Sequence, residues 1–166
     1  IISNSFFSLS LASTGPINST FDPSFDPCNN YTDLDHPWRA SNETGLGVCD
    51  RRFPWNGWYR VLYYGKSIRM AESCVPTSRC STYVTLWLNG PHPEIEDGVV
   101  TRQVCGSANS DCCYYRSTPI QVKACPDNYY VYKFVHPINC NLAYCSGTLI
   151  HCTHFISSRH LSYCHS

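Results

Sequence analysis

Cysteine is the residue type in this chain whose number and spacing offer the most chemistry. The 166-residue sequence contains twelve cysteines, and two of them, Cys112 and Cys113, are adjacent. A dense and even set of cysteines is typical of chains that fold in an oxidising compartment and form disulfides. Adjacent cysteines bond to each other only with strain. We therefore expect Cys112 and Cys113 to have two different partners and to join three segments of the chain.

Ten of the cysteines lie between residues 26 and 146, and we predict that they form a structural framework rather than a catalytic or redox site. They are Cys28, Cys49, Cys74, Cys80, Cys105, Cys112, Cys113, Cys125, Cys140 and Cys145. Their spacing leaves the pairing open, because ten cysteines can pair in about 900 ways.

The segment 147–166 holds the other two cysteines and several histidines, which raises the alternative of a zinc site. The residues concerned are Cys152, Cys164, His151, His154, His160 and His165. Their gaps differ from the usual spacing of zinc ligands, and two cysteines in a secretory chain tend to pair with each other. We therefore expect no metal site and interpret this segment as a loose tail.

Asparagine is the second residue type whose spacing predicts chemistry. Three Asn-x-Ser/Thr triplets begin at Asn18, Asn30 and Asn42, and none has proline in its middle position. Such triplets are the acceptor sites for N-glycosylation in secreted chains. The three asparagines are therefore candidate glycan carriers.

The sequence lacks the usual catalytic patterns, including Gly-x-Ser-x-Gly, His-Glu-x-x-His and a glycine-rich phosphate loop. His36 and His92 each precede a proline, which favours an extended or turn conformation and a structural role. Glu94, Glu96 and Asp97 lack the ligand spacing of a calcium loop, so a solvated turn is the better interpretation. We predict no enzyme, no catalytic residue and no cofactor.

The composition of the chain argues against nucleic acid and membranes as partners. The formal net charge is zero and only 14% of residues are charged, so no field of one sign attracts nucleic acid or an anionic membrane. No apolar run approaches the roughly 18 residues of a membrane span. Aromatic residues make up another 14%, which suits a small domain that fills its interior with rings.

Segments in which apolar and polar residues alternate indicate strands, and these strands would position the cysteines and the glycan acceptors. The stretch 58–64 lies between two glycines and is rich in strand formers, with 68–70 pairing back to it across 65–67. Residues 120–124 and 130–134 alternate on either side of a Pro-Asp-Asn turn and predict a hairpin. A single helical turn fits 140–145. The fold class predicted is a small disulfide-rich domain, a β-rich α+β fold with short strands, hairpins and a few short helices.

The amino-acid composition along the sequence divides the chain into three parts. Residues 1–25 are interpreted as a flexible leader, with the remnant of a signal peptide as the alternative. Residues 26–146 contain the cysteine framework and all four tryptophans, and we interpret them as the folded domain. Residues 147–166 form the tail. Phe53, Trp55 and Trp58 could form a recognition surface, but we expect them, like Trp87, to serve the core and its turns.

The middle of the chain carries an ordered series of motifs. They are Asp26-Pro27-Cys28, Gly57-Trp58-Tyr59-Arg60, Arg69-Met70-Ala71-Glu72-Ser73-Cys74, Trp87-Leu88-Asn89-Gly90, the vicinal cysteine pair, Val122-Lys123-Ala124-Cys125 and Cys140-Asn141-Leu142-Ala143-Tyr144-Cys145. In this order they resemble the cysteine-rich decoy domain of the uromodulin and pancreatic secretory-granule glycoprotein family.

This resemblance implies a non-enzymatic, N-glycosylated extracellular module whose high-mannose glycans are bound by a lectin such as a bacterial adhesin. Asn30 lies in a sequon that matches the family, whereas Pro91 replaces the hydroxyl residue two positions after Asn89 and removes a second acceptor. Secretion or display outside the cell follows from the same likeness. The alternative is a structural spacer or adhesion module that contacts neighbouring extracellular domains of a larger protein.

Overall fold

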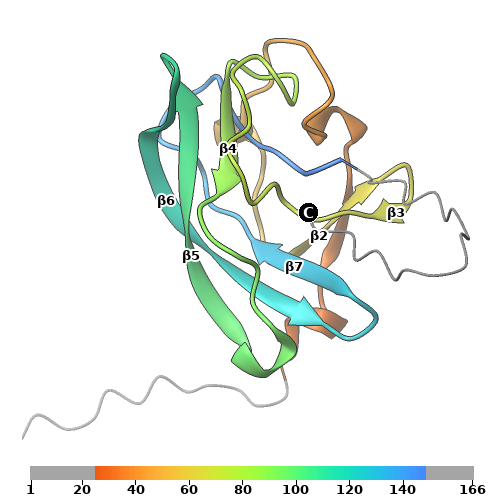
Figure 1. The fold of residues 1–166 in the computed structure, drawn as a ribbon. Coiled ribbons are helices and arrows are strands. Elements are labelled where there is room, and N and C mark those ends of the chain that lie inside the picture. The colour runs from red at the N-terminus through yellow and green to blue at the C-terminus, as the bar shows by residue number, and fades with distance from the viewer. Residues whose placement is uncertain (1–24, 149–166) are drawn as a thin grey trace, which may run out of the picture.

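A computed structural model of the chain describes residues 25–148 (Figure 1). Within this range the regular elements are eight strands and four three-residue 3-10 helices. The strands are β1 (Thr32–Asp35), β2 (Tyr59–Tyr63), β3 (Lys66–Ser67), β4 (Val84–Leu88), β5 (Val99–Ala108), β6 (Asp111–Cys125), β7 (Tyr129–Lys133) and β8 (Leu142–Tyr144). The 3-10 helices are η1 (Pro27–Asn29), η2 (Pro37–Arg39), η3 (Asp50–Arg52) and η4 (Ile95–Asp97). No helix in the described part is long and apolar enough to cross a membrane.

All eight strands belong to one sheet with the order β1-β2-β7-β6-β5-β4-β8, and β3 pairs with β2. The long strands β5 and β6 form a twisted hairpin along one side of the molecule (Figure 1). Neighbouring strands are antiparallel except at the two edges, where β1 is parallel to β2 and β8 is parallel to β4. A bridge between Ala40 and Ser146 joins the segments that follow the two edge strands, so the sheet curves back on itself.

The predicted hairpin is confirmed: β6 and β7 are antiparallel, with Ala124 opposite Tyr130. Asp127 and Asn128 in its turn have positive φ angles of 67° and 58°. Asn and Asp tolerate this left-handed conformation better than most residues, because their short side chains bond locally. Strand β6 begins at Asp111, however, which makes it far longer than the alternation predicted.

The strand predicted over 58–64 is also confirmed, as β2, but its partner differs from the expected one. The chain turns at Tyr64 and Gly65, which both have positive φ, and Lys66 and Ser67 already pair with β2. Ile68 extends the pairing by one hydrogen bond, in which its N–H donates to the carbonyl of Val61 at 3.0 Å. The turn is therefore shorter than the sequence indicated.

The predicted disulfide-rich, strand-rich domain with a few short helices is confirmed, but the α+β class and one expected helical turn were wrong. The described residues contain no α-helix, so the domain is a mostly β structure with 3-10 turns rather than a β-rich α+β fold. The expected helical turn at 140–145 is the edge strand β8, which pairs with β4 through Thr85 and Ala143. Its flanks are held as well, because Val84 donates to the carbonyl of Asn141 and Cys145 donates to that of Leu86, both at 2.8 Å. A one-turn helix would forgo these sheet bonds.

The main core is a cluster of sixteen buried side chains. They come from β1, β2 and β4 to β8 and from the segments that follow β3 and β7. Because both edge strands contribute, the curved sheet encloses its own core and requires no covering helix. All five residues of β4 are buried, so this strand shows no alternation along the sequence.

Five disulfides tie the sheet together, and within residues 25–148 no cysteine is free. The bonds are Cys28–Cys125, Cys49–Cys140, Cys74–Cys112, Cys80–Cys145 and Cys105–Cys113. The first two join residues 97 and 91 positions apart. Each long-range link restricts the unfolded chain more than a local link would.

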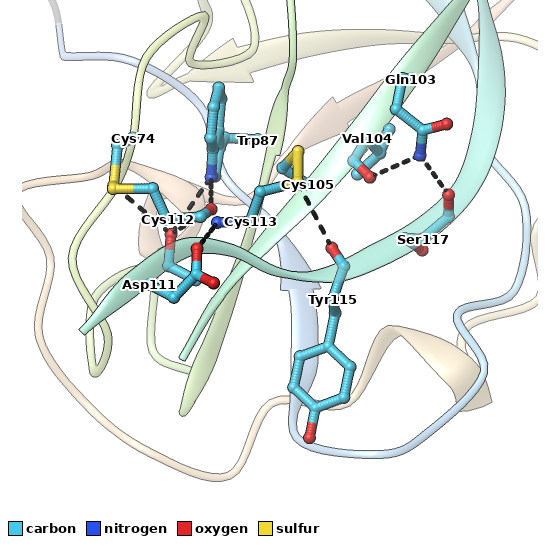
Figure 2. Close-up of a disulfide and its surroundings, with 11 residues drawn as sticks. Cys74, Trp87, Gln103, Val104, Cys105, Asp111, Cys112, Cys113, Tyr115 and Ser117 are labelled. Carbon is cyan, nitrogen blue, oxygen red and sulfur yellow. Dashed lines mark hydrogen bonds between the residues drawn. A yellow bond between two sulfur atoms is a disulfide. The ribbon is translucent and has the colours of Figure 1, made fainter. Parts of the chain in front are cut away.

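The vicinal cysteines have separate partners (Figure 2). Cys112 bonds to the loop that carries Cys74, and Cys113 bonds across the hairpin to Cys105 on β5. Trp87 of β4 packs beside them, and its indole N–H donates to the carbonyl of Cys112 at 2.8 Å (Figure 2). Three segments therefore meet at this point.

Candidate functional site

The best-placed glycan acceptor is Asn30, which is exposed and directly follows η1. Thr32, the hydroxyl residue of its sequon, is exposed at the start of β1. Tyr31, between them, is partly buried, with its ring centroid 5.7 Å from that of Tyr129. The sequon is thus anchored by its middle residue while the acceptor and the hydroxyl face solvent.

Several bonds hold η1 beneath Asn30. The Asp26 carboxylate accepts the N–H of Cys28 at 2.9 Å and the ammonium of Lys123 at 2.8 Å. These two bonds, with that from Lys123 the stronger, lower the pKa of Asp26. The Tyr129 hydroxyl donates to the carbonyl of Cys28 at 2.9 Å, and the Cys28–Cys125 disulfide fixes the turn to the end of β6. A glycan on Asn30 would therefore leave the protein from a well-supported point.

Asn42 is the second acceptor in the described residues and is also exposed. It lies in a tight turn in which Glu43 donates its N–H to the carbonyl of Ala40 at 2.9 Å. The turn is tied on both sides, because Ser41 donates to the carbonyl of Ser146 and Cys80 donates to that of Glu43. Sequence reasoning identified this sequon but gave no sign of the surface beside it.

The remaining asparagines named from the sequence differ in status. Asn18 lies outside the described residues. Asn89 is exposed just after β4, and its N–H donates to the carbonyl of Gln103 at 2.9 Å. Pro91 follows two residues later, so this exposed site lacks the hydroxyl that an N-glycan acceptor needs.

The aromatic residues considered as a recognition surface serve the interior instead. Trp58 is 6% exposed and packs around the Cys28–Cys125 bond, and Trp87 is 8% exposed. Trp55 is partly buried against the main core, where its ring lies 4.8 Å from Phe134. Its indole N–H donates to the carbonyl of Asp50 at 2.9 Å, which closes a turn. The expectation that these rings support the core and its turns is confirmed.

His92 joins a chain of polar groups that runs inward from the partly exposed Glu72 and that the sequence did not reveal. Its Nδ1 bonds to the Glu72 carboxylate, and its Nε2 lies 2.6 Å from the phenolic oxygen of Tyr132. Because a carboxylate only accepts, Nδ1 carries the proton and Nε2 accepts from the Tyr132 O–H. Tyr132 in turn accepts the N–H of Met70 at 3.0 Å.

Burial sets the protonation of this chain. It lowers the pKa of His92, with the bond from Glu72 opposing, and it raises the pKa of Tyr132. The pKa of Glu72 is lowered overall, because its bonds with His92 outweigh the burial that would raise it. Carboxylate, imidazole and hydroxyl in series are typical of a nucleophilic site. Here the hydroxyl belongs to Tyr132, which is 0% exposed, so a substrate has no access and the group holds the fold together.

A second buried polar group lies where η2 and η3 meet β8. Arg39 and Asp50, each 1% exposed, form a two-bond ion pair at 2.6 and 2.8 Å. Asp50 also accepts the N–H of Tyr144 at 2.7 Å, and Arg39 donates to the carbonyl of the same residue at 3.2 Å. The guanidinium carbon lies 4.2 Å from the centroid of the Trp38 ring. The pair thus ties β8 to η2 and η3.

The candidate metal sites have different outcomes. Asp97 accepts the N–H of Glu94 at 2.9 Å and closes η4, so this acidic cluster is an exposed capped turn. Across residues 25–148, no three His, Cys, Asp or Glu side chains are grouped to hold a metal ion. The cysteine and histidine residues of segment 147–166 lie outside the described residues.

Comparison with known proteins gives the same family that the motifs suggested. The model of the uromodulin-like cysteine-rich domain matches residues 59–146. Uromodulin of Mus musculus is 48% identical over 122 residues, which cover 73% of this chain and 18% of that protein. The pancreatic secretory granule membrane major glycoprotein GP2 of Homo sapiens is 43% identical over 123 residues, covering 74% of this chain and 22% of that protein.

The counterpart of GP2 in Canis lupus familiaris is 45% identical over 124 residues, covering 74% of this chain and 24% of its own length. The chain therefore spans about a fifth of the length of these relatives. Disulfides in this number persist only in oxidising surroundings, so the domain is secreted or displayed outside the cell. With more than half of its residues matched in an ordered cysteine framework, the chain belongs to the uromodulin-like cysteine-rich domain family.

Proposed function

We propose that this domain is a non-enzymatic extracellular module that presents an N-glycan on Asn30 to a mannose-binding lectin, such as the adhesin of a bacterium. The observation that carries the proposal is the anchoring of the Asn30 sequon. The acceptor and Thr32 are exposed, while the residues around them are fixed by a disulfide, a carboxylate cap and the Tyr31 ring. A lectin binds a glycan with a fixed attachment point at a lower cost in entropy than a glycan on a mobile loop.

The protein surface supports the glycan and leaves the recognition to it. Trp58 and Trp87, which are of the type that dominates most protein-binding surfaces, are turned inward, and the exposed aromatic side chains include Tyr64, Tyr83 and Tyr114. The Tyr132 hydroxyl at the inner end of the Glu72–His92–Tyr132 chain is fully buried, so it cannot reach a substrate. We therefore assign recognition to the sugar, which the exposed and anchored Asn30 sequon supports.

The test begins with glycopeptide mass spectrometry of the protein secreted by its own tissue, centred on Asn30. A high-mannose glycan there, together with bacterial binding that free mannose inhibits, is the expected result. Thr32→Val removes the sequon and should abolish the binding, whereas the matched variant Thr32→Ser keeps the sequon and should retain it. An unoccupied Asn30, or equal binding by both variants, would contradict the proposal.

A second candidate function is a structural spacer between neighbouring extracellular domains. The disulfides favour it, because Cys28–Cys125 and Cys49–Cys140 each span more than ninety residues and make the domain a cross-linked unit. A spacer needs no glycan. Normal assembly of the parent protein by Thr32→Val, with no lectin bound by the unaltered protein, would favour this function over presentation.

A further inference from the structure

A pocket of about 670 Å³ lies beside the second sequon. Asn42 and its neighbour Ser41 line it, and most of the remaining lining comes from the segment 68–76 that follows β3. Small-molecule sites in proteins have volumes of roughly 300–1,000 Å³, so a pair of sugar rings can be accommodated. The acceptor residue for a sugar chain is therefore itself part of the wall of a pocket.

The lining has the mixed character that a sugar requires. Arg69, Glu72 and Arg79 bring charged donors and acceptors, and Ser73 adds a hydroxyl. Met70, which is 2% exposed, supplies part of an apolar floor. The hydroxyl and acetamido groups of N-acetylglucosamine both donate and accept hydrogen bonds, while the C–H faces of its ring are apolar.

The charged groups of the pocket remain available for a ligand. Arg69 and Glu72 are 3.9 Å apart, and their side chains are 41% and 27% exposed. An exposed ion pair at this separation contributes little to stability. The Arg69 guanidinium can therefore donate to a ligand with little loss of folding free energy. Glu72 bonds to His92 through Oε1. Its second carboxylate oxygen has no hydrogen bond among those found for the described residues, so it can accept from a sugar hydroxyl.

The backbone around Asn42 fixes where a glycan would start. The turn is closed by the bond between Glu43 and Ala40, and Thr44 forms a bridge with Arg79. Arg79 also lines the pocket, so the sequon and the pocket wall are paired directly. A sugar attached at such a point reaches the pocket without diffusing to it, and its effective concentration there is high.

We propose that this pocket binds the first N-acetylglucosamine units of an N-glycan carried by Asn42. The glycan would lie against the segment 68–76, whereas a glycan on Asn30 would project into solvent from its anchored sequon. The Asn42 glycan would then be shielded from enzymes that trim or remove it. This proposal goes beyond presentation by Asn30 and can hold or fail independently of it.

The test compares the two sites in the same folded, secreted full-length chain. N-glycosidase treatment under native conditions, followed by mass spectrometry, gives a separate release rate for each asparagine. We expect release at Asn42 to be several-fold slower than at Asn30, and the difference to vanish after reduction and denaturation. An unoccupied Asn42, or equal native rates, would overturn the proposal.

A pocket variant separates binding from simple crowding at the acceptor. Arg69→Ala removes a partly exposed side chain from the lining and should bring the Asn42 release rate close to that of Asn30. The matched control is Arg51→Ala, because Arg51 is exposed on η3 and does not line the pocket. If the two variants release the glycan at the same rate, the lining does not bind it and the proposal fails.

Hydrogen exchange gives a readout that does not depend on an enzyme. Thr44→Val abolishes the sequon while Thr44→Ser preserves it, and the backbone bridge to Arg79 is available to both. Amides in 68–76 should exchange several-fold faster in the valine variant, which lacks the sugar. Equal exchange would mean that the pocket is open, or covered by something else, in both variants, and would contradict the proposal.

Discussion

The Nε2 atom of His92 lies 2.6 Å from the phenolic oxygen of Tyr132. This contact joins the loop before η4 to β7. The same oxygen accepts the N–H of Met70, and the opposite side of the imidazole bonds to Glu72. One buried histidine thus connects three separate stretches of the chain.

Tyr132→Phe should lower the free energy of unfolding by about 1–3 kcal/mol. The substitution keeps the ring but leaves the Met70 N–H and the His92 Nε2 without their shared partner. Urea denaturation monitored by tryptophan fluorescence measures the change. Tyr130→Phe is the matched control, because Tyr130 is only partly buried and its ring contacts the same histidine. Equal effects of the two variants would show that the hydroxyl of Tyr132 has no special role.

Stability should fall as the pH drops below about 6.5, the ordinary pKa of histidine. Burial lowers the pKa of both His92 and His36. For His92, the positive charges of Arg69 and Arg102 add to this effect and Glu72 opposes it. A group of this kind binds fewer protons when folded, so its contribution is present above its unfolded pKa and is lost as the pH falls toward its folded pKa.

Urea denaturation at a series of pH values between about 7.5 and 5.5 gives the slope of the free energy of unfolding against pH. His92→Gln should reduce the slope, and the double variant His36→Gln/His92→Gln should reduce it further. Below about pH 4.5 the lowered pKa of Glu72 adds a further loss, because this carboxylate is stabilised when charged in the folded protein. If the double variant had the same slope as the unaltered protein, the two histidines would not be the source of the pH dependence.

Arg39→Met should destabilise the domain by about 3–5 kcal/mol, because it leaves the carboxylate of Asp50 buried without its counter-ion. Arg51→Met, which alters an exposed arginine on η3, should change the stability by less than about 0.5 kcal/mol. Urea denaturation of both variants is the measurement. A loss of similar size in the control, or a negligible loss in Arg39→Met, would mean that the ion pair does not have this structural role.

The Cys74–Cys112 bond should be the first disulfide to open under limited reduction. Both of its cysteines are exposed, whereas Cys80 and Cys145 are 0% and 1% exposed. Thiol–disulfide exchange requires access to the sulfur atoms, so the exposed bond reacts first. Brief treatment with dithiothreitol, alkylation and peptide mass mapping reveal the order. Early labelling of Cys80 or Cys145 would contradict it.

Local sequence signals identified the elements whose neighbours lie nearby in the chain. The hairpin of β6 and β7 and the strand β2 could be read from alternation and turn residues. Strands β4 and β8 could not, because they are buried throughout, and β8 exists only through its pairing with residues nearly sixty positions away. The stretch 140–145, which begins and ends with a cysteine, fits a helical turn as well as a strand until its pairing partner is known.

The candidate sites divide in the same way. Sequons and cysteines are visible as residue types, so Asn30 and Asn42 could be named from the sequence. The pocket beside Asn42 and the contact of His92 with Tyr132 depend on side chains brought together from distant segments. Neither leaves a local pattern, because the fold alone determines which residues meet.

The pairing of Cys28 with Cys125 has a mechanical consequence for any force that passes through this domain. Along the backbone, a pull between Cys28 and Cys145 would act on about 117 residues, which extend to roughly 400 Å. The disulfide offers a shorter route, which crosses directly to Cys125 and continues along about 20 residues, or roughly 70 Å. Under tension the domain would therefore extend along about 20 residues instead of about 117, and the disulfide would carry the load even after the sheet had come apart.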